Sequence, residues 1–205
     1  MQYPDWFNRR LTERYLRRKG VEWSGELPVM DMRKPPQFLR FGSGRIKLGS
    51  GVRIFTHLGI PKLHVGHGSV ITIGDRSVIN GAFQLHAESE GGITIEPHVL
   101  IAPRVIIMDS NMHPISEGET WSPRPILLKR NCWLCDDCKI MPGVEVGEHS
   151  VVGAGSKVTD SVPLRTVVDG NPARIVRQVV CRDDWVRETD PIWIGSHGRD
   201  WFQKR

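Results

Sequence analysis

Aliphatic residues recur every six positions across residues 126–158. The recurring positions are Leu128, Leu134, Ile140, Val146, Val152 and Val158. A small or β-branched residue stands two positions before each of the later ones: Cys132, Cys138, Val144, Ser150 and Ser156. A period of six is neither the 3.6 of a helix nor the 2 of an ordinary strand. It is typical of a solenoid in which each hexad forms one short flat side of a coil. The sequence therefore predicts an all-β solenoid.

The same period extends towards the N-terminus and is broken at a few places. It recurs as Leu48 and Ile54, then Ile73, Ile79 and Leu85, then Ile95, Ile101 and Ile107. The step from Val65 to Ile73 is eight, residues 86–92 disturb the register, and the pattern stops over 109–125. Interruptions of a solenoid form loops on one face, and such loops often carry the binding site. We therefore expect an extruded loop at 109–125.

Three parts follow one another along the chain. Residues 1–43 are predicted to contain an amphipathic helix at 5–19 followed by an irregular connecting arm. Residues 44–178 are predicted to form the solenoid, and residues 179–205 a C-terminal arm. We expect the helix to cover the open end of the coil or a neighbouring subunit, since strand edges need a cover; a membrane-surface role for this basic helix is the alternative. Trp185, Trp193 and Trp201 lack the hexad rhythm, so the arm is expected to cross the coil or the next subunit.

Composition and charge narrow the possible partners. No apolar run approaches the length of a membrane span, and the N-terminus lacks the apolar core of a signal peptide, which predicts a cytoplasmic protein. The formal charge of +5 favours a solvated surface with some anion sites over a nucleic-acid-binding surface.

Three cysteines form a C-x2-C-x2-C motif that in another context suggests a metal site. Cys132 and Cys138 are one hexad apart, so the solenoid places them at equivalent positions on two different sides of the coil. Side chains on different sides do not converge on one ion. We therefore interpret these cysteines as small apolar packing residues and expect no metal.

Several motifs add a resemblance to this pattern. They are His113-Pro114 in the interrupting loop, Pro142 to Val144, the VGAGS of Val152 to Ser156, and the GNPAR of Gly170 to Arg174. Over residues 44–178 the chain resembles the hexapeptide-repeat acyltransferases, and among them the maltose and galactoside type of sugar O-acetyltransferase. The resemblance implies a left-handed parallel β-helix, an exception to the usual right-handed crossover. It also implies a homotrimer with active sites between subunits.

Ten residues are candidates for the site, nine of them through the resemblance. His113 occupies the place of the catalytic base, a task that suits an imidazole because it titrates near neutral pH. Asn80 matches an acceptor-binding position, Glu90 lies near one, and Trp121 matches a position that lines the active-site region, although Asn80 also suits an ordinary Asn-Gly turn. Asp109, which begins the interrupting loop, could orient His113, contact substrate or equally be a plain loop acid. The donor acetyl-CoA is expected at Trp133, Ala154, Thr159, Arg174 and Arg177.

The donor region departs from the family pattern at two places. Cys135 and Asp136 follow Trp133 where the family has Gly and often a small residue, and Asp160 replaces a common Lys. A carboxylate beside phosphates is electrostatically unfavourable. At Asp136 and Asp160 the resemblance therefore gives weaker support for contacts with acetyl-CoA.

The resemblance implies transfer of an acetyl group from acetyl-CoA to a hydroxyl of a sugar or glycoside acceptor. An amino-sugar N-acyltransferase is the nearest chemical alternative. A γ-type zinc carbonic anhydrase would need a second histidine soon after His113, but the next one is His149. A non-catalytic scaffold of the same fold is the remaining class.

Overall fold

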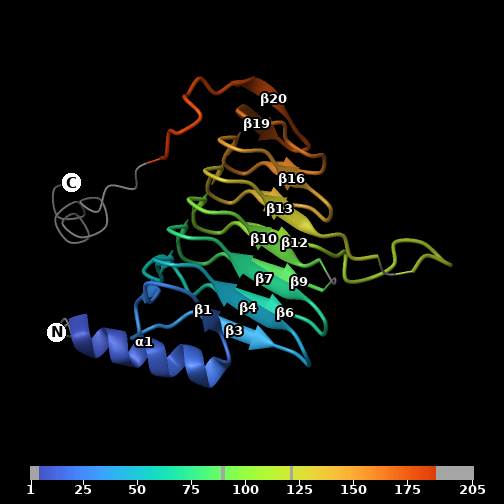
Figure 1. The fold of residues 1–205 in the computed structure, drawn as a ribbon. Helices are drawn as coiled ribbons and strands as arrows, with labels where there is room; N and C mark the ends of the chain where they lie inside the picture. The colour runs from blue at the N-terminus through green and yellow to red at the C-terminus, as the bar shows by residue number, and fades with distance from the viewer. Residues whose placement is uncertain (1–4, 89–90, 121, 188–205) are drawn as a thin grey trace.

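The structure is a triangular coil of parallel strands with one helix at its N-terminal end (Figure 1). The computed structural model describes residues 5–88, 91–120 and 122–187. Up to residue 158, successive strands pass from sheet A to sheet B to sheet C and back to A, so each turn of the coil adds one strand to every sheet. The last two strands, over residues 166–178, both belong to sheet B and pair antiparallel. The coil is the predicted left-handed parallel β-helix.

The strands are short, and each sheet is a ladder of successive turns. Sheet A contains β1 (Glu22–Trp23), β4 (Arg45–Leu48), β7 (Val70–Ile73), β10 (Ile93–Ile95), β13 (Ile126–Leu128) and β16 (Glu145–Val146). Sheet B contains β2 (Val29–Met30), β5 (Arg53–Ile54), β8 (Val78–Ile79), β11 (Leu100–Ile101), β14 (Trp133–Leu134), β17 (Val151–Val152), β19 (Thr166–Gly170) and β20 (Ala173–Gln178). Sheet C contains β3 (Gln37–Arg40), β6 (Lys62–Val65), β9 (Gln84–Ala87), β12 (Ile106–Met108), β15 (Lys139–Ile140) and β18 (Lys157–Val158).

The hexad residues form the core inside the coil. In sheet B, for example, Ile101 lies in register with Leu134, and Leu134 with Val152, and all three side chains are buried. Burial of an aliphatic side chain contributes about 1.5–3 kcal/mol, so the repeat is the main source of stability. Cys132 and Cys138 are also fully buried in this core and precede strands of different sheets, as their spacing predicts.

The coil begins earlier than the hexad pattern indicates. Residues 20–43 were expected to form an irregular arm, but β1, β2 and β3 within them pair in parallel with β4, β5 and β6. The sequence pattern missed this first turn because its strands are separated by irregular connections of uneven length.

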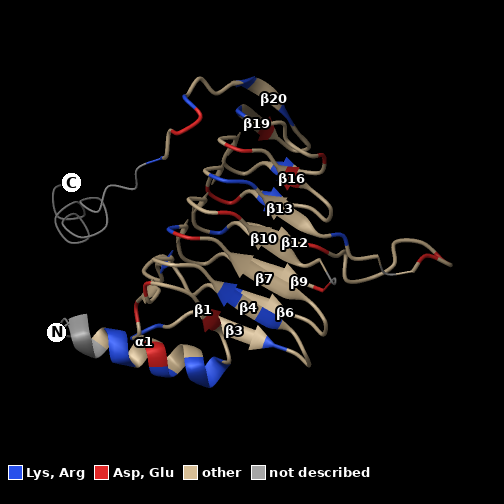
Figure 2. Ribbon diagram, in the orientation of Figure 1, with Lys and Arg blue, Asp and Glu red and all other residues tan. Residues whose placement is uncertain are grey.

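The helix α1 (Asp5–Lys19) lies across the N-terminal end of the coil (Figure 1). Leu16 is fully buried in the core, and the Tyr15 hydroxyl donates to the carbonyl of Pro36. The helix therefore covers the open end, as expected. Figure 2 shows basic residues on α1 and charges of both signs along the coil. Among the described residues, no helix has the length and hydropathy of a membrane-spanning segment.

The three corners of the coil differ in regularity. The turns from sheet A to sheet B, here called the A–B corner, keep the six-residue step from Leu48 to Ile54 up to Val146 to Val152. The turns from C to A, the C–A corner, contain the disturbed segment 86–92 and the long loop 109–125, which projects from the coil between β12 and β13 (Figure 1). The B–C corner carries the turn that includes Gly153 to Ser156.

Residues with positive φ form the corners. At the A–B corner Arg76, His98, Asn131, His149 and Arg165 all have φ between 51° and 62°. Each donates its backbone N–H to a carbonyl one turn below, as His149 does to Arg130 (3.1 Å). Non-glycine residues rarely adopt this conformation, and here the backbone ladder supports it.

Candidate active site

His113 lies on the extruded loop and is exposed. The loop leaves the coil after β12, and residues 111–120 are all exposed in the single chain. An exposed imidazole on a projecting loop can reach a partner surface or a substrate bound there.

Asp109 anchors the base of this loop. Its side chain is fully buried, and both carboxylate oxygens accept the backbone N–H of Glu88, at 2.7 and 2.9 Å. Its own carbonyl accepts the N–H of Arg124 (2.7 Å). The carboxylate of Asp109 therefore ties the start of the loop to the neighbouring turn, and its carbonyl joins the start of the loop to the end.

An acidic residue that the sequence analysis did not select lies beside the loop base. The carboxylate of Glu88 is 3.2 Å from Nε2 of His64, and the ring centroids of His64 and His86 are 5.5 Å apart on neighbouring strands of sheet C. Burial is the largest cause of a lowered pKa for His86, followed by the nearby His64. In the sequence, only the disturbed register at 86–92 pointed to the cluster of Glu88, His64 and His86. That disturbance could not show which acidic residue faces the histidines.

Asn80 lies at the other edge of sheet C from the loop. It follows β8 at the B–C corner, is half-buried, and its side-chain amide is 3.5 Å from the carbonyl of Ile101. Glu90 and Trp121 lie outside the described residues. Asn80 and His113 are thus at different corners of one chain.

The five donor-side residues are distributed over the upper part of sheet B and the adjoining part of sheet C. Trp133 is 39% exposed on β14, and Ala154 is exposed in the turn after β17. Thr159 follows β18, and Arg174 and Arg177 are exposed on β20. A Cβ built on Gly155, in the same turn as Ala154, meets nothing within 4 Å. The backbone there has room for a ligand alongside.

The two unexpected carboxylates each have an arginine partner. Asp136 forms an ion pair with Arg104 (2.9 Å), and Asp160 is 3.7 Å from Arg174. Both pairs are exposed, so each contributes little to stability. The arginines nevertheless offset part of the negative charge, which reduces the expected repulsion between these carboxylates and the donor phosphates.

Cys135 is held as a neutral thiol. Burial raises its pKa to about 11, the nearby Arg187 lowers it, and Asp136 raises it further. A thiol with such a pKa is a poor nucleophile at neutral pH. Within residues 5–88, 91–120 and 122–187, no group of three or more His, Cys, Asp or Glu side chains could hold a metal ion.

Comparisons with known proteins agree with this geometry. Residues 125–160 match the family described as bacterial transferase hexapeptide (six repeats). The chain is 37% identical over 128 residues to a galactoside O-acetyltransferase of Escherichia coli K12, covering 60% of this chain and 61% of that protein. It is 32% identical over 120 residues to a protein of the same organism provisionally named as a colanic acid biosynthesis acetyltransferase, covering 58% and 65%. The chain thus spans less than two thirds of the length of these relatives.

One solved structure extends the comparison to a donor complex. It is a hexapeptide-repeat acetyltransferase of Vibrio cholerae O1 biovar eltor complexed with acetyl coenzyme A, with a TM-score of 0.55 and 25% identity, covering 82% of this chain and 78% of that one. The ligand of that protein, acetyl coenzyme A, is the donor that the sequence analysis expects at Trp133 and Ala154.

Proposed function

We propose that this chain, a member of the hexapeptide-repeat transferases, transfers an acetyl group from acetyl-CoA to a hydroxyl of a sugar or glycoside. The feature that best supports the proposal is the exposed His113, on the long loop of a coil similar to those of acetyltransferases. An amine of an amino sugar could react in the same arrangement, so the acceptor has to be determined by assay.

The reaction would be a direct transfer with His113 as general base. An imidazole nitrogen takes the proton of the acceptor hydroxyl while the hydroxyl oxygen attacks the carbonyl carbon of the thioester. Backbone N–H groups would stabilise the oxyanion that forms. The carbon–sulfur bond then breaks, and the imidazolium returns the proton to the departing thiolate. The products are an acetyl ester and CoA.

We place the active site between neighbouring subunits of a homotrimer in the cytoplasm. In one chain His113 is at the C–A corner, whereas Trp133 lies on sheet B and Ala154 at the B–C corner. A neighbouring copy could bring its loop to this donor surface. The site proposed here is therefore incomplete in a single chain.

An acceptor screen tests the chemistry. The purified protein is incubated with acetyl-CoA and a panel of sugars, glycosides and amino sugars, and thiol release is measured. We expect release with a hydroxyl acceptor and a roughly 10²- to 10⁴-fold loss in His113→Ala. His67→Ala is the matched control, because His67 is also exposed at the C–A corner. Undiminished turnover in His113→Ala would overturn the assignment, and acetylation only of amines would replace it with N-acyl transfer.

A mixing experiment tests the shared site. His113→Ala and a donor-side variant such as Trp133→Ala are each expected to be weakly active. Co-expressed, they should form mixed trimers in which some interfaces combine an intact loop with an intact donor surface, and activity should recover. Light scattering that gave a monomer would contradict the shared site.

A further inference from the structure

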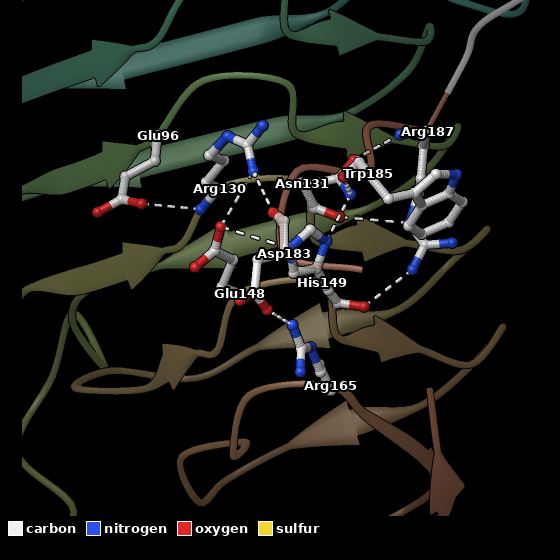
Figure 3. Close-up of polar contacts among 9 residues, drawn as sticks. All are labelled: Glu96, Arg130, Asn131, Glu148, His149, Arg165, Asp183, Trp185 and Arg187. Atoms are coloured by element: carbon white, nitrogen blue, oxygen red, sulfur yellow. Dashed lines mark hydrogen bonds and ion pairs between the residues drawn. The ribbon is translucent and has the colours of Figure 1, made fainter. Parts of the chain in front are cut away.

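The C-terminal arm folds back along the A–B corner of the coil. The N–H of Val179 donates to the carbonyl of Arg165 (2.7 Å), and the Arg165 guanidinium pairs with the carboxylate of Asp183. Further along, Trp185 and Arg187 reach Asn131, two corner positions below Arg165 (Figure 3). The arm therefore crosses three successive turns of the coil.

Asn131 fixes both the arm and the tautomer of a buried histidine. Its Oδ1 accepts the backbone N–H of Arg187 (2.8 Å), and its Nδ2 donates to the carbonyl of Trp185 (2.9 Å). These two bonds set which side of the amide is the donor. The same Nδ2 lies 2.7 Å from Nδ1 of His149, so that ring nitrogen must accept. The proton of the ring is then on Nε2, which faces the carbonyl of Asp183 at 3.2 Å.

The side chain of Arg187 extends from this network to the donor surface. Its Nε donates to the carbonyl of Asn131 (3.2 Å) and its Nη2 to the carbonyl of His149 (2.8 Å). The guanidinium carbon lies 5.8 Å from the ring centroid of Trp133 and 4.7 Å from that of Trp185. Two hydrogen bonds to the coil thus hold a cation against the partly exposed indole of Trp133.

We propose that the C-terminal arm is a positioning element of the donor site, in which Arg187 fixes the Trp133 indole only while His149 is neutral and the arm is docked. This inference rests on the proposed function, in which Trp133 lines the path of the coenzyme A thioester. Arg187 acts through Trp133 and is a positioning residue. Docking of the arm and binding of the donor would then be coupled.

Protonation of His149 opposes docking. A cationic ring would carry a proton on Nδ1, facing the N–H of Asn131, which leaves that donor without an acceptor. The charged groups facing His149 are Glu148, whose carboxylate is 3.5 Å from Nε2, and the arginines Arg130, Arg165 and Arg187.

The sign of the pH effect follows from these surroundings. Burial is the largest cause of the lowered pKa of His149; Glu148 raises it and the three arginines lower it further. Release of the arm uncovers the ring and removes Arg187, so the pKa of His149 is lower in the docked state than in the released state. The released state therefore binds the proton more readily, and docking weakens as the pH falls.

Arginine substitutions test the positioning role in the intact protein. CoA is titrated calorimetrically at pH 7.5 into Arg187→Gln, Arg187→Lys and the control Arg182→Gln, whose exposed side chain lies on the same arm next to Asp184. We expect CoA to bind roughly three- to tenfold more weakly to Arg187→Gln, because a cation–π contact is lost. The same variant should raise KM for acetyl-CoA and leave kcat almost unchanged. Arg187→Lys should recover part of the affinity, and Arg182→Gln should match the wild type.

Hydrogen exchange tests, without any enzymatic turnover, whether docking of the arm requires a neutral His149. The amide of Arg187, which donates to Asn131, should exchange slowly at pH 7.5 and lose protection at pH 5.5 once intrinsic rates are corrected. In His149→Asn protection should be the same at both pH values, since asparagine tolerates positive φ and does not titrate. His149→Gln serves as a second neutral variant if the first fails to fold.

The outcomes separate the two proposals. Wild-type affinity for CoA in Arg187→Gln would overturn the positioning role. Arm protection independent of pH in the wild type would overturn the requirement for a neutral His149. Either result would leave acyl transfer intact. Failure of the wild-type protein to bind CoA would overturn the proposed function, and the positioning role with it.

Discussion

The C–A corner and the A–B corner of the same coil differ in how much insertion they contain. The C–A corner contains the loop 109–125, whose residues 111–120 are all exposed. The A–B corner keeps the six-residue step, its positive-φ residues are joined by a backbone ladder, and its upper part is covered by the arm. An interruption is tolerated where the chain can project into solvent, whereas a corner that also carries a docked segment has no such freedom.

An insertion at each corner would test this difference most strongly. Two residues, Gly-Ser, inserted after Gly147 would break the ladder bonds of His149 and Arg165 and displace the arm. We expect the unfolding free energy to fall by roughly 3 kcal/mol or more, because each lost hydrogen bond costs about 1 kcal/mol and the core register shifts. This corresponds to a Tm lower by roughly 6 °C or more, measured by calorimetry.

The matched control is the same insertion after Gly118 in the loop. Its built Cβ meets nothing within 4 Å, and the surrounding residues are exposed. The loop insertion should change Tm by less than about 2 °C, since lengthening a loop costs little. Equal losses of Tm at the two sites would show that the corners do not differ in this way.

A smaller effect is expected at the base of the loop. Asp109→Asn keeps the size of the side chain but replaces one acceptor oxygen facing the Glu88 N–H with an amide donor. We expect a loss of about 1–3 kcal/mol in unfolding free energy, measured by denaturant unfolding. Acyl transfer should also weaken, because the first residue of the loop that carries His113 is bound less firmly to the neighbouring turn at Glu88. A fully stable variant would show that the buried carboxylate does not anchor the loop.

The smallest effect is expected for a surface ion pair near the donor residues. Asp136→Ala removes the partner of Arg104, and both side chains are largely exposed. The unfolding free energy should change by less than about 1 kcal/mol, because exposed pairs are screened by water and salt. A clear gain in affinity for CoA, measured by calorimetry, would instead show that this carboxylate repels the donor phosphates.

The sequence alone was sufficient for the coil, the position of its main loop and the packing of the cysteines. A six-residue period can bury one aliphatic side chain per flat side only in a coil, so Leu134, Val152 and their equivalents determine the fold locally. The same repeat predicts that His113 lies on an exposed loop, since a long break in a strict repeat has to leave the coil.

Other features depended on contacts between segments far apart in the chain. The first turn of the coil, the pairing of Glu88 with His64 and the anchoring role of Asp109 depend on register between turns, which the repeat does not encode. The docking of Arg187 against Asn131, 56 residues away, obeys no periodicity at all. The repeat determined what each turn buries, and only the tertiary structure decided which surface the arm covers, because that choice is made by individual hydrogen bonds and one buried histidine.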